Sequence, residues 1–261
     1  MSNLSVDRSG FRLGRTPVKP EQAAKALRLS AFTSDELPMP PREVDYLAPM
    51  GEIGMLGNDR FGCCVFAGMA HLAQSVSAVM GAKYEPAEGE VLDAYSTVTG
   101  FRQDDPDTDL GTNLLEALTW WKRNRFCGVE IEGFAKVDHD DWRKTQQGLW
   151  LFGGVLDGAD LPLIAQRQKK WRVEVGHADD QVRPGGWGGH CYAGHRRIFD
   201  VYQRPEMETS NWGDVTAITG AWNDAYVAER YVVLAKGWTP PNAPGFDRDR
   251  LLQAMRNQEL R

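Results

Sequence analysis

The first half of the chain places its apolar residues with a helical period. Residues 64–81, CVFAGMAHLAQSVSAVMG, are apolar on most faces, which predicts a buried helix ending near Gly81. Residues 84–100 begin as a loop and continue with a helical period. Residues 114–126, LLEALTWWKRNRF, predict an amphipathic helix with a basic end, closed near Gly128. We therefore expect this half to form a helical lobe.

The second half changes its period. Residues 129–138 alternate between apolar and polar positions, which predicts a strand, and residues 138–150 predict a short helix capped by Asp138 or Asp140. Three further apolar stretches separated by glycine turns predict strands, within residues 150–162, 190–203 and 226–238. A helical lobe followed by a β-rich lobe indicates an α+β fold.

The pattern divides the chain into four parts. Residues 1–50, rich in Pro, Arg and Lys, predict an extended N-terminal arm with one short helix around residues 21–29, laid over the core or over a partner. Residues 51–128 form the helical lobe and residues 129–238 the β-rich lobe. Residues 239–261 form a Pro-rich joint and a charged helical tail, which either packs on a neighbour or stays in solvent. Homo-oligomerisation or assembly through the terminal segments is therefore possible.

Composition narrows the classes of partner. The chain has 261 residues, 42% of them hydrophobic, and a formal net charge of −6. It has no long basic stripe, no bilayer-length apolar run and no Sec-type apolar leader, so we expect no nucleic acid, no membrane and no signal peptide. No CxxC pair occurs among its four cysteines, so we expect reduced thiols rather than a disulfide framework or a structural zinc: Cys63, Cys64, Cys127 and Cys191.

Metal and cofactor sites are not indicated. The stretches HDD at residues 139–141 and HADD at residues 177–180 bunch metal-ligand types, but both are typical of exposed charged turns. No glycine-rich phosphate loop with its lysine is present. We therefore expect neither a metal nor a cofactor.

A cysteine at a helix start is the first candidate for chemistry. In GNDRFGCCVFAGMAH, residues 57–71, Cys64 stands where a glycine-rich loop becomes a helix. Free N–H groups and the helix dipole lower a thiol pKa at that place and favour the reactive thiolate. The alternative is that both adjacent cysteines are small core residues, since cysteine is often buried.

His190 is the best candidate for a base. It follows paired glycines in GGWGGHCYAGH and opens an expected strand, whereas His195 on the same strand faces the other way and His71 lies about two helical turns from Cys64. In the later stretch TSNWGD, Asn211, or else Ser210 or Asp214, is a candidate to orient the imidazole. The alternatives are a strand histidine at a turn and an ordinary Asx turn with a core tryptophan.

The order Cys, then His, then an Asn-Trp-Gly element resembles the papain-like cysteine peptidases. GGHCYAGH is similar to that family's GGHA-type strand, SNWG to its NSWG segment, and DLGTNLLEALTWWKRN to the helix after its central one. The resemblance implies a two-lobed α+β fold with a cleft between the lobes, Cys64 as nucleophile and His190 as base. It places Asn58, six residues before Cys64, where the family has an oxyanion-binding glutamine.

The chain also resembles, more specifically, phage and prophage proteins with a GNDxYGDCVxAGxAH motif and an LGR.P arm, here LGRTP at residues 13–17. This implies a location in the host cytoplasm or the virion. It departs from the papain pattern in three places: Val65 follows the nucleophile, Phe61 replaces a stapling cysteine, and Ser210 holds the place of the orienting asparagine, with Asn211 one residue later. A one-residue shift in a strand reverses the side chain.

Three functions remain open from the sequence. The first is a papain-like cysteine hydrolase that cleaves a peptide or peptidoglycan amide bond, with Cys64, His190, Asn211 and Asn58 as catalytic residues. The second is a virion structural or assembly protein on the same scaffold with weak or no activity, because a fold does not fix a function. The third is another Cys–His enzyme, such as an endolysin-type amidase or a transglutaminase.

Overall fold

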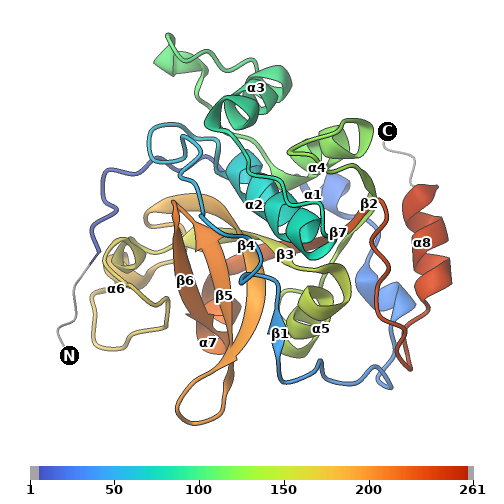
Figure 1. Ribbon diagram of the computed structural model, residues 1–261. Coiled ribbons are helices and arrows are strands. Elements are labelled where there is room, and N and C mark those ends of the chain that lie inside the picture. Colours follow the sequence, from blue (N-terminus) through green and yellow to red (C-terminus); the bar gives the residue numbers. More distant parts are fainter. Residues whose placement is uncertain (1–5, 258–261) are drawn as a thin grey trace.

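The architecture is a seven-stranded antiparallel sheet with helices on both faces, described for residues 6–257 of a computed structural model (Figure 1). The sheet order is β2-β7-β3-β4-β5-β6, and β1 pairs with β4 beyond that path. The strands in that order are β2 (Ile131–Lys136), β7 (Val227–Ala235), β3 (Val155–Leu161), β4 (Gly188–Phe199), β5 (Pro205–Asn211), β6 (Asp214–Thr219) and β1 (Val44–Asp45). Helices dominate residues 51–128 and strands dominate residues 129–238, which confirms the expected α+β fold.

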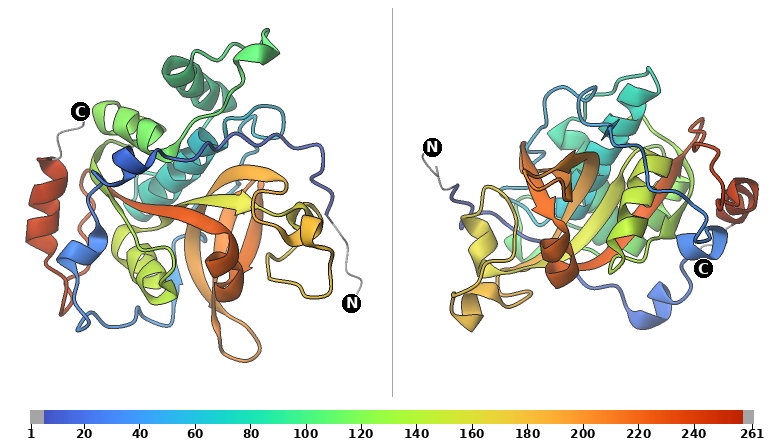
Figure 2. Two further views of the ribbon diagram at one scale, coloured as in Figure 1. Left: turned by 180° about the vertical axis from the view of Figure 1, so that it is seen from behind. Right: turned by 90° about the horizontal axis from the view of Figure 1, so that it is seen from below.

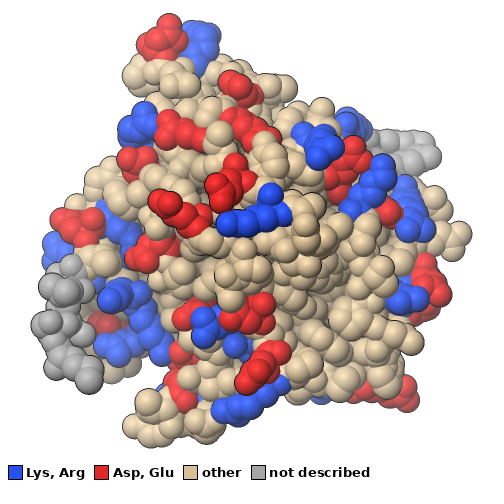
Figure 3. All heavy atoms as spheres, in the orientation of Figure 1, with Lys and Arg blue, Asp and Glu red and all other residues tan. Residues whose placement is uncertain are grey.

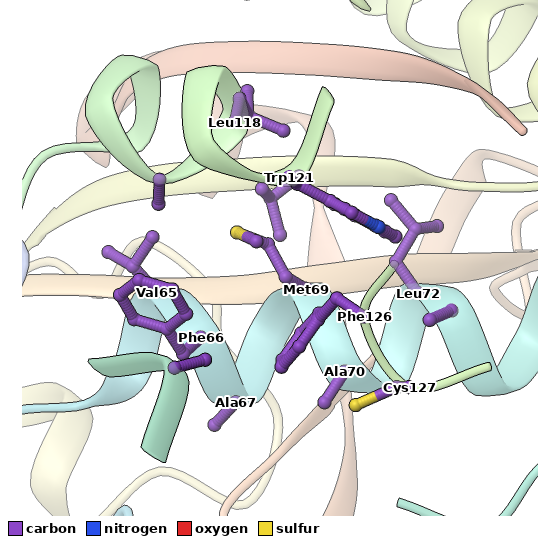
Figure 4. Packing of buried hydrophobic residues seen from close by; sticks show 14 of the residues in the cluster. Val65, Phe66, Ala67, Met69, Ala70, Leu72, Leu118, Trp121, Phe126 and Cys127 are labelled. Atoms are coloured by element: carbon purple, nitrogen blue, oxygen red, sulfur yellow. The ribbon is translucent and has the colours of Figure 1, made fainter. Parts of the chain in front are cut away.

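The helical lobe is built around α2 (Cys64–Val79), with α3 (Glu88–Thr99) and α4 (Leu114–Arg123) beside it. Figure 4 shows Met69 and Leu72 of α2 directed toward Trp121. The other face of α2 lies on β4, so almost every residue of the helix is buried. This double packing explains why its sequence is apolar on most faces.

Two hydrophobic cores lie on the two faces of the sheet. Along β7, Tyr231 and Val233 belong to the core shared with the helical lobe, whereas Val232 and Leu234 belong to the second core. Successive side chains of a strand point to opposite faces, so a strand buried on both faces needs a continuous apolar run. The stretch YVVLA meets that need.

The second core is covered by α5 (Trp142–Phe152), α7 (Gly220–Tyr226) and the C-terminal helix α8 (Arg248–Arg256). The tail packs on this chain itself: Leu251 and Met255 are fully buried, and α8 lies against β2. The remaining short helices are α1 (Pro20–Ala23), α6 (Asp179–Val182) and three 3-10 turns, η1 (Leu29–Phe32), η2 (Pro106–Thr108) and η3 (Leu163–Gln166).

Some boundaries differ from the sequence-based expectation. The predicted cap of α5 was wrong: Asp141, not Asp138 or Asp140, caps the helix by accepting the N–H groups of Arg143 and Lys144. The helix also continues to Phe152, so the strand expected from residue 150 begins only at Val155. Strands β5 and β6 and helix α7 were not expected, because residues 205–226 are largely polar and lack a clear period.

The most buried charges form a single network inside the β-rich lobe. Arg230 and Asp157 are both fully buried, and the guanidinium donates to both carboxylate oxygens at 2.5 and 2.8 Å. Arg230 also donates to Thr145 Oγ1 and to Asn223 Oδ1. On the face shown in Figure 3, by contrast, positive and negative side chains are interspersed. None of the described helices has the length and apolar character needed to cross a membrane.

Candidate active site

Cys64 is the first residue of α2, and its side chain is fully buried. The loop before it turns through left-handed backbone at Leu56 and Gly57, with φ of 58° and 76°. The neighbouring Cys63 points elsewhere, with its Sγ 3.6 Å from the carbonyl oxygen of Leu56. All four cysteines are free. The thiol at the helix start is therefore Cys64, as the sequence predicts.

The surroundings of Cys64 keep the thiol neutral. Burial raises its pKa to about 11, against the lowering effect of the backbone N–H groups of Gly14, Cys191 and Arg15. A helix N-terminus favours a thiolate, but here desolvation is the larger effect. In this arrangement the sulfur is covered and the neutral thiol is favoured.

His190 is the third residue of β4 and is fully buried. Its ring stacks on Trp212, with centroids 3.9 Å apart and planes 12° from parallel. Neither ring nitrogen has a hydrogen-bond partner within residues 6–257. Burial, helped by the charge of Arg8, moves its pKa well below the usual value. The imidazole is therefore neutral and is not bonded to Cys64 as the structure stands.

The three candidates to orient His190 have other hydrogen bonds. Asn211 donates from Nδ2 to Thr209 Oγ1 at 3.4 Å, and its Oδ1 has no partner in the described part of the chain. Asp214 accepts the N–H of Val215. Trp212, with φ of 47°, turns the chain so that its indole, rather than a polar side chain, covers His190.

Ser210 instead bonds to His195, which the sequence does not predict to lie in the site. Its Oγ lies 2.7 Å from His195 Nε2, and both residues are fully buried. His71 of α2 is buried beside them and bonds through Nε2 to the Gly54 carbonyl oxygen at 3.0 Å. Burial lowers the pKa of His71 to about 4 and that of His195 to about 3. The period-two alternation of a strand predicted that His195 faces away from His190. No sequence signal predicted that Ser210 is its partner.

Asn58 lies in the loop before α2 and is buried. Its backbone N–H donates to the Met55 carbonyl oxygen at 3.1 Å, and its side-chain Oδ1 has no hydrogen-bond partner among residues 6–257. The loop therefore holds the backbone in place and leaves the side-chain oxygen without a partner. An oxyanion-binding role for Asn58 stays a prediction.

The N-terminal arm passes over the site, a course that no sequence pattern predicts. Residues 8–16 run between the helical lobe and the sheet, as the blue segment in the left view of Figure 2. On the helical side, Thr112 donates its N–H to Gly14 and accepts the N–H of Thr16, at 2.9 and 3.0 Å. On the sheet side, Arg15 donates its N–H to Gly189 at 3.1 Å. The arm is thus bound like a strand across the entrance to Cys64.

Glycines make this close approach possible. A Cβ on Gly14 would lie 1.8 Å from the Gly62 carbonyl oxygen, and a Cβ on Gly111 would lie 1.9 Å from the Gly14 carbonyl oxygen. On the other wall, a Cβ on Gly189 would lie 2.2 Å from the Arg15 carbonyl oxygen. No real side chain fits at such distances, so both walls are bare where the arm passes.

Asp109 fixes the helical wall of this cleft. Its carboxylate accepts the Gly62 N–H at 3.0 and 3.1 Å and the Tyr95 hydroxyl at 2.8 Å. The same hydroxyl accepts the Gly111 N–H at 2.8 Å. Arg12 of the arm adds an ion pair to Asp109 at 3.4 Å. One buried carboxylate therefore ties both glycines of the wall to the arm.

The site contains a thiol and an imidazole, which are groups that acyl transfer uses, beside backbone groups that bond to the arm. No three metal-ligating side chains gather anywhere in the described part of the chain. Among the described residues, neither ring nitrogen of His190 is bonded to the Cys64 thiol.

No protein-family model matches this chain, and a search of curated protein sequences found no match. Solved structures do match. Xylellain, a cysteine protease from Xylella fastidiosa, has a TM-score of 0.63 at 12% identity, covering 88% of this chain and 97% of that one. A chain from a study of the mite allergens Blo t 1 and Der p 1 has a TM-score of 0.58 at 15% identity, covering 90% and 83%.

A third similar structure is the bromelain protease from Ananas comosus in complex with the E64 inhibitor, with a TM-score of 0.53 at 10% identity, covering 74% of this chain and 99% of that one. At such identities the likeness concerns the fold alone. The fold is papain-like, with a helical lobe and an antiparallel β-rich lobe, as the motifs led us to expect.

Proposed function

We propose that this chain is a papain-like cysteine hydrolase that cleaves a peptide or peptidoglycan amide bond. The observation that carries the proposal is the strand-like binding of residues 8–16 across the start of α2, over the Cys64 thiol. A cleft that holds a stretch of extended polypeptide against a thiol is suited to hold a substrate in the same place.

In the proposed reaction, Cys64 Sγ attacks the amide carbonyl carbon after its proton has passed to His190. The carbonyl oxygen becomes an oxyanion, for which Asn58 and the backbone N–H of Cys64 are the proposed donors. The C–N bond then breaks, and His190 returns the proton to the leaving amine. Water, deprotonated by His190, finally hydrolyses the thioester and regenerates the thiol. Asn211 is the proposed orienting residue for His190.

The test is the pH dependence of Cys64 alkylation by iodoacetamide in a full-length variant with a loosened arm, Gly14→Ala. A thiolate–imidazolium pair gives fast labelling well below the free-thiol pKa of about 8.5, lost in Cys64→Ser and slowed in His190→Ala. Labelling that follows an ordinary thiol in the loosened variant, unchanged by His190→Ala, would contradict the proposal. Hydrolysis of denatured protein and of peptidoglycan fragments then separates the two substrate classes.

A structural or assembly role on the same scaffold is the second candidate. The observations that favour it are the absence of a hydrogen bond on either His190 nitrogen among the described residues and the exposed tip of the β4–β5 hairpin. At that tip Val201 and Tyr202 are 87% and 76% exposed, which suits contact with a partner surface. An unreactive thiol in the loosened variant would select this role.

A phage or prophage origin belongs to the same proposal. It is supported by the LGRTP and GNDRFGCCVFAGMAH motifs alone. The expected locations are the host cytoplasm or the virion. Mass spectrometry of purified particles from a strain that encodes the chain tests the second location, and its absence from particles would favour the first.

A further inference from the structure

The side chain of Arg15 enters a pocket of the β-rich lobe beside the cleft. Its Nε and Nη2 donate to Glu229 Oε1 at 3.0 and 2.8 Å, and its Nη1 donates to Asp160 Oδ1 at 2.7 Å. The side chains of Arg15 and Glu229 are 3% and 5% exposed, whereas that of Asp160 is 41% exposed. The pocket is therefore deep at Glu229 and opens to solvent at Asp160.

The pocket has room for a guanidinium because β3 carries a glycine at its wall. A Cβ on Gly158 would lie 2.7 Å from Arg15 Nε and 2.8 Å from Glu229 Cγ. Gly158 stands opposite Glu229 of β7 and Cys191 of β4 in the sheet. Gly158, which leaves room for the guanidinium, thus lies on the strand next to Cys191, the residue that follows His190.

The chemistry of the pocket favours arginine over other side chains. Two carboxylates from neighbouring strands accept from both sides of one planar fork, a geometry that the single point charge of lysine does not match. Without a cation, Glu229 would be a buried carboxylate with Asp160 nearby, a costly arrangement. The pocket therefore favours a guanidinium group over an ammonium group.

The backbone around Arg15 is held by hydrogen bonds to both walls of the cleft, as a bound peptide would be. Gly14 and Thr16 bond to one wall of the cleft through Thr112, and Arg15 bonds to the other wall through Gly189. Backbone bonds of this kind are independent of sequence, and a side-chain pocket then supplies the selection. Within the bound stretch, Arg15 is the residue whose guanidinium is paired with two carboxylates.

We propose that the pocket formed by Gly158, Asp160 and Glu229 recognises an arginine side chain of a peptide bound in the cleft, and that Arg15 occupies it when the arm is in place. This deepens the proposed function, because it names the side chain that the hydrolase would select. Its test is a binding measurement that needs no reactive thiol, so the two proposals fail separately.

The first experiment uses the full chain with Cys64→Ser and Arg15→Ala, which empties the pocket. A fluorescent peptide with the sequence of residues 9–19, SGFRLGRTPVK, is titrated by anisotropy, beside a peptide with Gln in place of the second arginine. The arginine peptide is expected to bind at least about tenfold more tightly, because the Gln peptide leaves a buried carboxylate unpaired. The same chain with Arg15 retained is expected to bind the peptide at least about tenfold more weakly, since its pocket is filled.

Two pocket variants serve as matched controls. Glu229→Gln added to the emptied chain removes the buried charge, and Gly158→Ala added instead keeps both charges but fills the space. Each is expected to abolish the preference for the arginine peptide. Equal binding of the arginine and Gln peptides to the emptied chain would overturn the proposal.

A second measurement does not depend on the position of the arm. Millimolar n-propylguanidinium is expected to raise the Tm of the Arg15→Ala chain more than n-butylammonium does, and to have no such effect on the wild-type chain or with Glu229→Gln. Absence of this rescue together with absence of peptide binding would overturn the proposal. Rescue without any preference between peptides would also overturn it, since the pocket would then be only an anchor for the arm.

Discussion

Gly14 of the arm lies so close to Gly62 of the helical wall that a Cβ on Gly14 would stand 1.8 Å from the Gly62 carbonyl oxygen. The two residues are 48 positions apart in the chain and face each other directly before the start of α2. Any side chain at position 14 must therefore push the arm away from the wall. This bare contact is therefore one of those that allow the arm to cover Cys64.

Replacement of Gly14 by Ala is thus expected to expose the thiol. Burial is what raises the pKa of Cys64, so opening the arm lowers that pKa and moves the onset of alkylation to lower pH. Iodoacetamide labelling followed by mass spectrometry measures the rate. Gly10→Ala is the matched control, because a Cβ there meets no atom within 4 Å. Equal labelling of the two variants would show that the arm does not limit access.

The buried pair of Asp157 and Arg230 gives a prediction about stability. Asp157→Ala leaves a guanidinium uncompensated in the core of the β-rich lobe, which typically costs about 3–5 kcal/mol. Urea unfolding at neutral pH measures the loss. Glu130→Ala, which removes the exposed partner of Lys236, is expected to leave the midpoint unchanged. A small effect of Asp157→Ala would mean that water or another side chain reaches Arg230.

The buried histidines predict a loss of stability in acid. His71 and His195 have pKa values lowered to about 4 and about 3, whereas an unfolded histidine titrates near 6.5. The unfolded chain therefore takes up protons first, so stability is full above pH 6.5 and falls as the pH drops toward 4 and 3. Each pKa unit is worth about 1.4 kcal/mol, which gives on the order of 3 kcal/mol from His71.

Unfolding midpoints measured between pH 7.5 and 4 give the slope of stability against pH and test this prediction. His71→Gln and His195→Gln are each expected to flatten it, whatever they do to the stability at pH 7.5. His190 acts in the same direction, since its pKa is also lowered by burial. A slope that survives in both variants would place the acid-sensitive groups elsewhere.

The neighbours Ser210 and Asn211 are expected to differ in their effect on stability. Ser210→Ala removes the 2.7 Å hydrogen bond to His195 and leaves a buried ring nitrogen unpaired, at a typical cost of about 1–3 kcal/mol. Asn211→Ala removes only a 3.4 Å contact with Thr209 and is expected to cost less. Thermal unfolding of the two variants makes the comparison. A greater loss for Asn211 would indicate a hydrogen bond to another group, such as His190.

The C-terminal helix is expected to depend on Gly133 of β2. A Cβ there would lie 2.7 Å from both the Cβ and the carbonyl oxygen of Met255, so Gly133→Ala forces α8 away from the sheet. Faster cleavage by a protease within residues 239–247 would report the release. Gly89→Ala, at a position with no atom within 4 Å, is the control. Unchanged cleavage would mean that α8 adjusts without leaving.

Much of the architecture follows from local patterns. The run around Cys64 predicted α2 because a helix between two layers must be apolar on most faces, and the alternating or continuous apolar runs predicted β2, β3, β4 and β7. Residues 205–226 escaped prediction, since β5 buries mostly polar side chains and β6, at one edge of the sheet, alternates buried with partly exposed positions. Edge strands carry weak sequence signals for that reason.

The candidate site was harder to foresee for a different reason. The placement of Cys64 is local, because a glycine-rich loop and a helical period meet there. The contacts of His190, Ser210 and Arg15 are with residues distant in the chain or turned by an unusual φ at Trp212, and a period cannot reveal them. The motif LGRTP is visible in the sequence, but its binding to Thr112 and Gly189 depends on the tertiary structure.

The ion pair of Arg15 with Glu229 also sets an order of events during synthesis. The two residues are 214 positions apart, so the arm leaves the ribosome long before the strand that anchors it. Contacts of such sequence separation form late in folding. The ion pair that anchors the arm to the sheet therefore cannot form until β7 has been synthesised.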